Sequence, residues 1–179
     1  MAYANGHPVR LIGGRLALDF VNTADWSKDG KVIHEKIETP EDLNIWLDTL
    51  ELGPAMLPED VNHLHRFRAD IRSLLQGGQN TAALAPARQI NPAGLDRGQA
   101  VVTGQPLEAL IAISAMSILM DKRELERLKM CPAQDCGWLF IDETRNSRRR
   151  WCSMETCGNR AKANRHYARQ KTTQNVKSG

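Results

Sequence analysis

The spacing of apolar residues predicts that this chain is mostly helical. In four segments the apolar positions recur three and four residues apart, which places them on one face of a helix. One of them, LALDFVNT (residues 16–23), also alternates like a strand, and we favour a helix that ends near Thr23. The other three begin at Pro40, Pro58 and Pro106 and end before Gly53, before Gly77 and near Leu128.

Two segments lack this periodicity. Residues 24–38 are polar, and we expect them to form a loop. Residues 79–105 hold several prolines and glycines among small and polar side chains. Because a structureless loop of that length is uncommon inside a compact domain, we expect a short helix over 81–87 or a strand over 100–103 there.

The last third of the chain holds all of its cysteines, arranged as two C-x4-C pairs with fifteen residues between them. Four thiolates placed two and two suit a closed tetrahedral Zn²⁺ site, so we predict one structural zinc ion. Disulfides and an iron–sulfur cluster are the alternatives. The N-terminus has no signal-peptide pattern, and well-separated pairs favour a mononuclear site. The predicted ligands are Cys131, Cys136, Cys152 and Cys157.

The residues around the cysteines predict a small module that the metal holds together. Residues 131–137 read as a tight knuckle whose backbone N–H groups point at the sulfurs. Strands are expected over 138–141 and 148–151, with a turn over 142–147 between them. A helix from about Met154 to Gln170 begins within the second cysteine pair.

The predicted fold class is therefore mostly α with a small α+β part. A helical N-terminal domain, residues 1–128, is followed by a treble-clef-like zinc finger, residues 129–179. In the finger the metal replaces most of a hydrophobic core, so we expect that part to unfold when zinc is removed.

Charge divides the chain at the same place. Residues 1–130 carry a net charge of −3 and residues 131–179 a net charge of +6. A basic segment on a mildly acidic body is typical of nucleic-acid binding, and arginine binds phosphates through charge-assisted hydrogen bonds. The sequence does not separate DNA from RNA. The candidate contact residues are Arg145, Arg148, Arg149, Arg150, Arg160, Lys162, Arg165 and Arg169.

Other classes of function are disfavoured by the sequence. No apolar run approaches the roughly 18 residues that a membrane crossing needs, so we expect a soluble, cytoplasmic chain. A nuclease built on such a finger needs histidines and acids around a second, open metal site. The finger contains only His166, and no nucleophile–base pair is recognisable, so we do not predict an enzyme.

Two polar residues interrupt the apolar segment LALDFVNT. Asp19 and Asn22 can satisfy helix ends or loop backbone, or they can line a pocket for a small-molecule effector. Both roles stay open at this point.

The motif Cys157-Gly158-Asn159-Arg160 and the residues that surround it resemble the CGNR zinc-finger family from Cys131 to about Arg169. The strings G-G-x-L-A-L-D-F-V-N-T over 13–23 and D-L-x-x-W-L over 42–47 resemble the ABATE domain that usually precedes this finger. Residues 79–105 depart from that pattern.

This resemblance implies a transcriptional regulator in which the four cysteines bind zinc and the finger contacts DNA. It places Arg160 and Lys162 at the start of the finger's helix, whereas Gly158 and Asn159 shape the turn around the metal. The N-terminal domain would sense an effector or form a dimer. We expect a homodimer, since one finger contacts few phosphates. RNA binding, or a zinc-stapled protein-interaction module, is the alternative.

Overall fold

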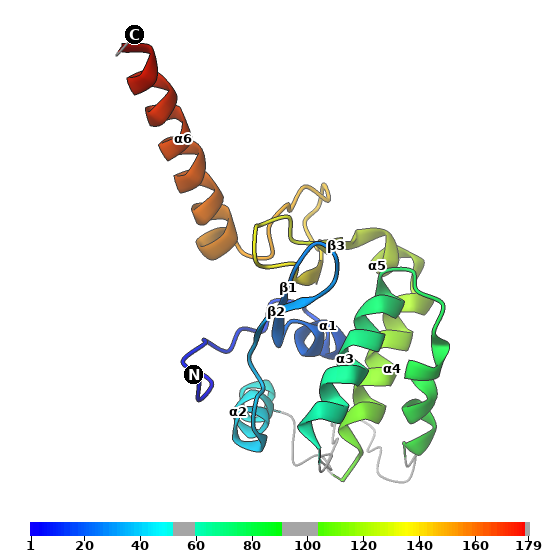
Figure 1. The fold of residues 1–179 in the computed structure, drawn as a ribbon. Coiled ribbons are helices and arrows are strands. Elements are labelled where there is room, and N and C mark those ends of the chain that lie inside the picture. Colours follow the sequence, from blue (N-terminus) through cyan, green and yellow to red (C-terminus); the bar gives the residue numbers. More distant parts are fainter. Residues whose placement is uncertain (52–59, 91–103, 178–179) are drawn as a thin grey trace.

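The computed structural model describes residues 1–51, 60–90 and 104–177, with side chains to residue 170. About half of the chain is helical, and the described strands form two small two-stranded sheets. The predicted class, mostly α with a small β part, is confirmed. Figure 1 shows a body of packed helices with the last helix projecting away from it.

Helix α1 (Leu16–Val21) lies at the centre of the fold and packs against α3 (Val61–Leu75) and α4 (Leu107–Met120). Its Phe20 ring lies 5.8 Å from that of Trp46 and 5.9 Å from that of Phe67, measured between centroids. The helix favoured for LALDFVNT is confirmed, and burial of both its faces explains why its periodicity was ambiguous.

Capping residues set the starts of the next two helices. Helix α2 (Pro40–Leu50) begins with a capping box, in which Thr39 and Asp42 each accept a backbone N–H from the other. Asp60 caps α3 by accepting the N–H of Asn62. Both predicted helices are confirmed, although the proposed start at Pro58 lies outside the described residues.

The single helix predicted from Pro106 to about Leu128 is wrong in its second half. Helix α4 ends at Met120, and a short helix, α5 (Lys122–Arg127), follows. Asp121 adopts an extended conformation and accepts the N–H groups of Arg123 and Glu124. This new N-cap competes with continuation of the helix, so the chain turns towards the finger.

The loop expected over residues 24–38 is also wrong. Strands β1 (Ala24–Trp26) and β2 (Val32–Glu35) pair in an antiparallel hairpin. Ala24 and Trp26 point into the core, and the tip closes where the Ser27 N–H donates to the Lys31 carbonyl at 2.8 Å. The alternation of apolar and polar residues was present but short.

A 3₁₀ helix, η1 (Thr81–Gln89), packs along α4 and α3. The short helix expected over 81–87 is thereby confirmed. The alternative strand over 100–103 lies outside the described residues.

The finger contains β3 (Leu128–Met130), β4 (Leu139–Ile141), a π-helical turn η3 (Met154–Gly158) and α6 (Asn159–Lys177). Strand β4 pairs with β3, and not with the strand predicted over 148–151, which forms no strand. The knuckle is therefore the loop of the β3–β4 hairpin. The domain boundary proposed at residue 128 falls inside β3.

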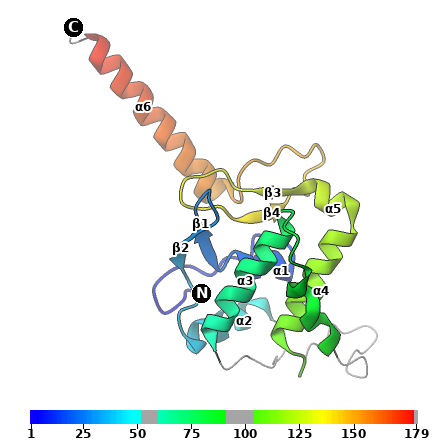
Figure 2. The ribbon, with the colours of Figure 1, turned by 45° about the vertical axis from the view of Figure 1, so that its right-hand side comes forward.

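The finger and the helical region share one core. Trp138, Leu139, Phe140 and Ile141 are buried in the same cluster as the side chains of α1, α3 and α4. Figure 2 shows the β3–β4 hairpin seated over α1 and α3, with α6 leaving from the far side of the finger. Within the described residues, no helix combines the length and hydropathy that crossing a membrane requires.

Candidate metal centre and nucleic-acid interface

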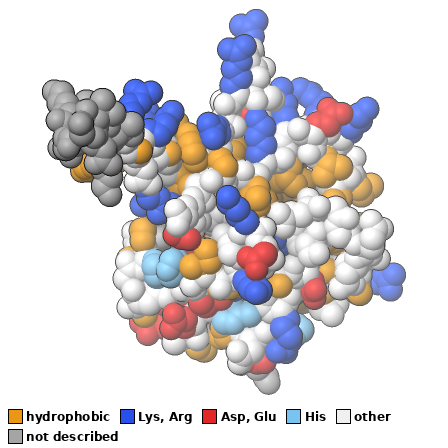
Figure 3. Space-filling model, turned by 45° about the horizontal axis from the view of Figure 1, so that its top comes forward, with side chains coloured by type: hydrophobic (Ala, Val, Ile, Leu, Met, Phe, Trp, Pro, Cys, Tyr) orange, Lys and Arg blue, Asp and Glu red, His pale blue; other side chains and the backbone are white. Residues whose placement is uncertain are grey.

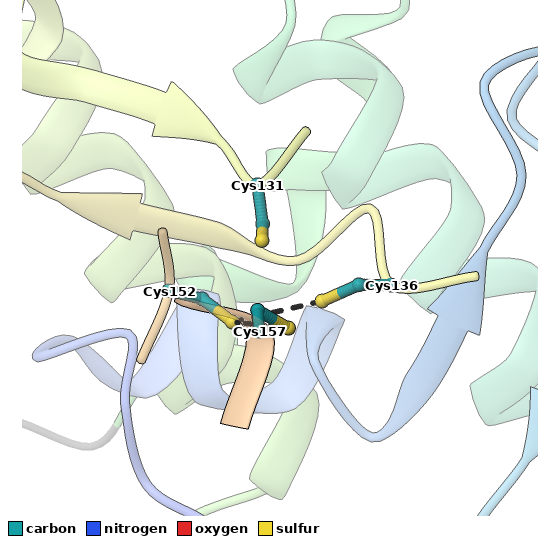
Figure 4. Close-up of side chains that lie close together, drawn as sticks. All are labelled: Cys131, Cys136, Cys152 and Cys157. Atoms are coloured by element: carbon teal, nitrogen blue, oxygen red, sulfur yellow. Dashed lines mark hydrogen bonds between the residues drawn. The ribbon is translucent and has the colours of Figure 1, made fainter. Parts of the chain in front are cut away.

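The four cysteines converge on one point from four places in the finger (Figure 4). Cys131 follows β3, Cys136 lies in the knuckle before β4, Cys152 ends the loop after β4, and Cys157 lies in η3. All four are buried, and their sulfurs lie within 4.8 Å of one another. The predicted ligand set is thus brought together.

The geometry fits a zinc ion and excludes disulfides. The Cys136–Cys152 and Cys152–Cys157 sulfurs are each 3.6 Å apart, and all four cysteines are free. A tetrahedron with Zn–S bonds of about 2.3 Å has sulfur–sulfur edges of about 3.8 Å, whereas a disulfide bond is about 2.05 Å long. Because all four ligands come from the chain, the site is closed and structural.

The electrostatics of the cluster also call for a cation. Contacts with the other three thiols, together with the nearby Arg160 charge, hold the pKa of the Cys157 thiol far below its ordinary value. Contacts of Cys152 with the other three thiols, together with its burial, raise the pKa of Cys152 well above its ordinary value. Four adjacent thiolates are stable together only when a divalent ion neutralises their repulsion. The Arg160 Nη2 donates to the Cys157 sulfur at 3.5 Å and supports the ligand from outside the shell.

The knuckle is built directly on strand β1. The Trp26 N–H donates to the Cys136 carbonyl at 3.0 Å, and Gly137 has a φ of 59°. A Cβ on Gly137 would lie 2.5 Å from the Trp26 carbonyl oxygen and 2.9 Å from its Cβ, so only glycine fits this close approach. The glycine expected for a tight turn is required here by a neighbour from the helical region.

A second contact joins the hairpin β1–β2 to the finger. The Trp138 Nε1–H donates to the Asp25 carboxylate at 2.8 Å, and the buried Lys36 ammonium donates to the same group at 2.7 Å. The ammonium lies 5.0 Å from the centre of the Trp138 ring. Trp138 is a core residue, as expected, and burial lowers the pKa of Lys36 despite its pairing with Asp25.

Asp19 and Asn22 form backbone hydrogen bonds that hold the fold together. The buried Asp19 carboxylate accepts the Gly13 N–H at 2.7 Å. Asn22 exchanges two hydrogen bonds with Leu139, donating to its carbonyl at 2.8 Å and accepting its N–H at 2.9 Å. These bonds agree with the role of satisfying loop and strand backbone, and the effector-pocket role stays a prediction.

Asp142 and Lys129 organise the arginine-rich loop over residues 143–151, a role that sequence reasoning missed. The fully buried Asp142 carboxylate accepts the Lys129 ammonium at 2.6 Å and the Arg149 N–H at 2.8 Å. Burial alone would raise the pKa of this carboxyl, but its hydrogen bonds, chiefly those from Lys129 and Thr144, hold it well below its usual range. Side-chain bonds thus replace the strand pairing that was predicted over 148–151.

The arginines of this loop differ from one another in exposure and in their contacts. Arg149 is half-buried: its guanidinium lies 4.5 Å from the Phe140 ring centre and donates to the carbonyls of Trp151 and Cys152. Arg145, Arg148 and Arg150 are exposed. Arg149 therefore secures the loop, and the other three present their charge to solvent.

These arginines line a groove of about 1300 Å³ between the loop and the N-terminal segment. Residues 10–12 also line it, so that Arg10 of the helical region borders the same groove as the finger's arginines. The lining contains five arginines and one acid, Glu155, which makes the groove strongly basic. Sequence reasoning missed Arg10 because it lies in an apolar run far from the cysteines.

Helix α6 carries the remaining candidates. It begins two residues after Cys157, has no continuous apolar face among its described side chains, and projects from the body (Figure 1). Figure 3 shows Lys and Arg side chains standing along this projection and on the neighbouring surface. Its exposed candidate residues are Arg160, Lys162, Arg165 and Arg169.

Comparison with known families agrees with this arrangement. Residues 127–170 match the family model described as "CGNR zinc finger". Residues 14–121 match the ABATE model, whose description is "Putative stress-induced transcription regulator". No curated protein matches the chain. The ABATE match covers more than half of this chain. The chain therefore belongs to the ABATE family, and a CGNR zinc finger follows its ABATE region.

Proposed function

We propose that this protein is a zinc-dependent DNA-binding transcription regulator, cytoplasmic and non-enzymatic. The observation that carries the proposal is α6, a 19-residue helix whose described part, to residue 170, is mostly polar and basic. A helix of that length extends about 28 Å, and one without an apolar face gains little stability from packing on its own chain. The DNA major groove admits a single α-helix, and phosphates on both sides attract its cations.

The arginine groove supplies a second contact beside the helix. Arg145, Arg148 and Arg150, together with Arg10, would hold the phosphate backbone while α6 reads base edges. The guanidinium of Arg150 lies 4.9 Å from the Trp151 ring centre, so its stem is partly fixed before any ligand binds. Zinc belongs to this proposal because its ligand Cys152 ends the arginine-rich loop and its ligand Cys157 precedes α6. The ion would therefore fix these two basic surfaces relative to each other.

The ABATE region would then regulate the finger, through a small-molecule effector, through homodimerisation, or both. A homodimer suits this proposal because a single finger makes few phosphate contacts. A dimer on a two-fold symmetric DNA site would make twice as many. The printed description of the ABATE model as a transcription regulator supports the same direction.

The test combines zinc content with duplex binding on one purified sample. We expect one zinc per chain and an affinity for mixed-sequence DNA that falls steeply with salt. The Arg148→Ala/Arg150→Ala variant should lower the salt slope by about two. A matched control, Lys31→Ala/Lys122→Ala, removes two exposed charges from the helical region and should leave the slope unchanged.

The same titration separates the alternatives. Binding to single-stranded RNA but not to duplex DNA would replace the DNA proposal with RNA recognition. Zinc present with no binding to either nucleic acid at low salt would leave the protein-interaction module.

A further inference from the structure

Helix α3 buries an arginine that lacks an obvious partner. Arg72 is only 3% exposed, and within the described part of the chain its Nε and Nη1 have no hydrogen-bond acceptor. The guanidinium lies 4.6 Å from the centre of the Trp26 ring, and its Nη2 donates to the Met130 sulfur at 3.5 Å. One turn earlier Arg68 is equally buried, but it pairs with Glu35 and Thr23.

An unpaired buried cation is strongly unfavourable, because it loses hydration without gaining a counter-charge. Among the described residues, no carboxylate forms an ion pair with Arg72. The Trp26 ring offsets part of this cost, and a nearby negative group would stabilise the guanidinium further.

The two residues that contact the Arg72 guanidinium are each connected to a cysteine of the cluster. Trp26, on which the guanidinium rests, is bonded through its N–H to the Cys136 carbonyl. Met130, which it touches, immediately precedes Cys131. Burial lowers the pKa of Arg72 to about 10, and a negative charge on Cys136 would oppose that shift.

We propose that Arg72 is the counter-charge of the zinc centre, so that the ABATE region takes part in binding the finger's metal. Zn²⁺ with four thiolates has a net charge of −2, and it fits the four sulfurs. A buried guanidinium beside the knuckle stabilises that dianion, and the dianion in turn balances the guanidinium. Lys36, buried on the same side, is a second cation in range of Cys136, although Asp25 already pairs with it.

In this arrangement the zinc ion links the ABATE region to the finger. Loss of the metal removes the fixed negative charge that stabilises Arg72 and weakens the contact of α3 with β1 and β3. Zinc occupancy therefore changes the ABATE region as well as the finger. The inference is independent of DNA binding and stands or falls without it.

The experiment measures zinc affinity of the full-length chain by competition with a chromophoric chelator. Arg72→Met, which keeps the bulk of the side chain without its charge, should weaken zinc binding at least about tenfold, as loss of outer-shell partners does. Arg72→Lys should restore most of the affinity. The matched control is Arg66→Met, on the same helix but exposed, which should bind zinc as the native chain does.

A purely structural role for Arg72 predicts a different pattern. If Arg72 balances the zinc centre, Arg72→Met lowers the melting temperature of the zinc-loaded protein and leaves that of the chelated protein equal or higher. Unchanged zinc affinity, or equal destabilisation with and without zinc, would mean that Arg72 acts only by packing on Trp26, and the proposal would be overturned.

Hydrogen exchange on the native chain decides the matter if Arg72→Met does not fold. Zinc removal should accelerate exchange of the amides in the C-terminal half of α3 and in β1, while α2 keeps its protection. Equal protection of α3 and β1 before and after chelation would refute the coupling.

Discussion

In the ABATE region, residues 14–121, buried apolar side chains from several helices interlock, whereas in the finger, residues 127–170, four sulfurs occupy the corresponding centre. The ABATE region is stabilised by non-directional burial, such as the stacking of Phe20 on Trp46 and Phe67. The finger depends on directional bonds to a metal and on the Asp142–Lys129 pair. Truncating a core side chain should therefore cost the first region a graded amount, while losing one ligand should disorder all of the finger that the shared core does not hold.

Removing zinc should have the largest effect and should act on the two regions unequally. Chelation, or Cys157→Ser, is expected to disorder the finger outside the shared core, since structural zinc contributes on the order of 10 kcal/mol to small zinc domains. The ABATE region should keep most of its helical circular dichroism. Tryptophan near-ultraviolet signals and amide spectra would report the loss, and zinc re-addition is the control. A finger that stays ordered without metal would break the contrast.

Truncating the core of the ABATE region should have a smaller, graded effect. Trp46 is 1% exposed, and Trp46→Ala should lower the free energy of unfolding by about 3–5 kcal/mol. Urea unfolding at saturating zinc measures this. Tyr167→Ala on the exposed part of α6 is the control and should change stability little. If Trp46→Ala lowered zinc affinity as strongly as it lowers stability, the two regions would form a single energetic unit.

The smallest effect concerns pH. Burial raises the pKa of Asp19 to about 6, above its ordinary value near 4, although backbone N–H groups from Gly13 and its neighbours oppose the shift. A raised carboxyl pKa means that the folded state holds the proton more tightly, so Asp19 contributes stability at low pH that is lost as pH rises through about 6. Between pH 5 and 7 this loss is roughly 1 kcal/mol.

Asp19→Asn should remove that contribution to the pH slope. The measurement is urea unfolding of the native chain and the variant at pH 5, 6 and 7 with excess zinc. Parallel pH profiles for the two proteins would show that Asp19 does not titrate in this range.

The cysteines and the helices were predictable because each depends on local spacing. C-x4-C pairs, the Thr39–Asp42 capping box and the prolines at helix starts are read directly from neighbours in sequence. Two of the wrong predictions failed for different reasons. Asp121 ends α4 early through a local N-cap that the apolar periodicity conceals, whereas β4 pairs with β3 instead of residues 148–151 because tertiary packing decides its partner. Arg10 and Arg72 gave no local signal, since the residues near them in the structure, such as Arg148 beside Arg10 and Trp26 and Met130 beside Arg72, lie more than forty positions away in sequence.

Asn22 has a consequence for anyone who exchanges fingers between proteins of this kind. Its amide pairs with both polar groups of the Leu139 main chain, as a neighbouring strand residue would, and so recognises no particular side chain. A transplanted finger of different sequence could therefore dock on the same amide. The Gly137 position is less tolerant, because the Trp26 backbone leaves no room for a side chain. A successful chimera would carry glycine there and retain the host's asparagine, and the splice would be placed ahead of β3.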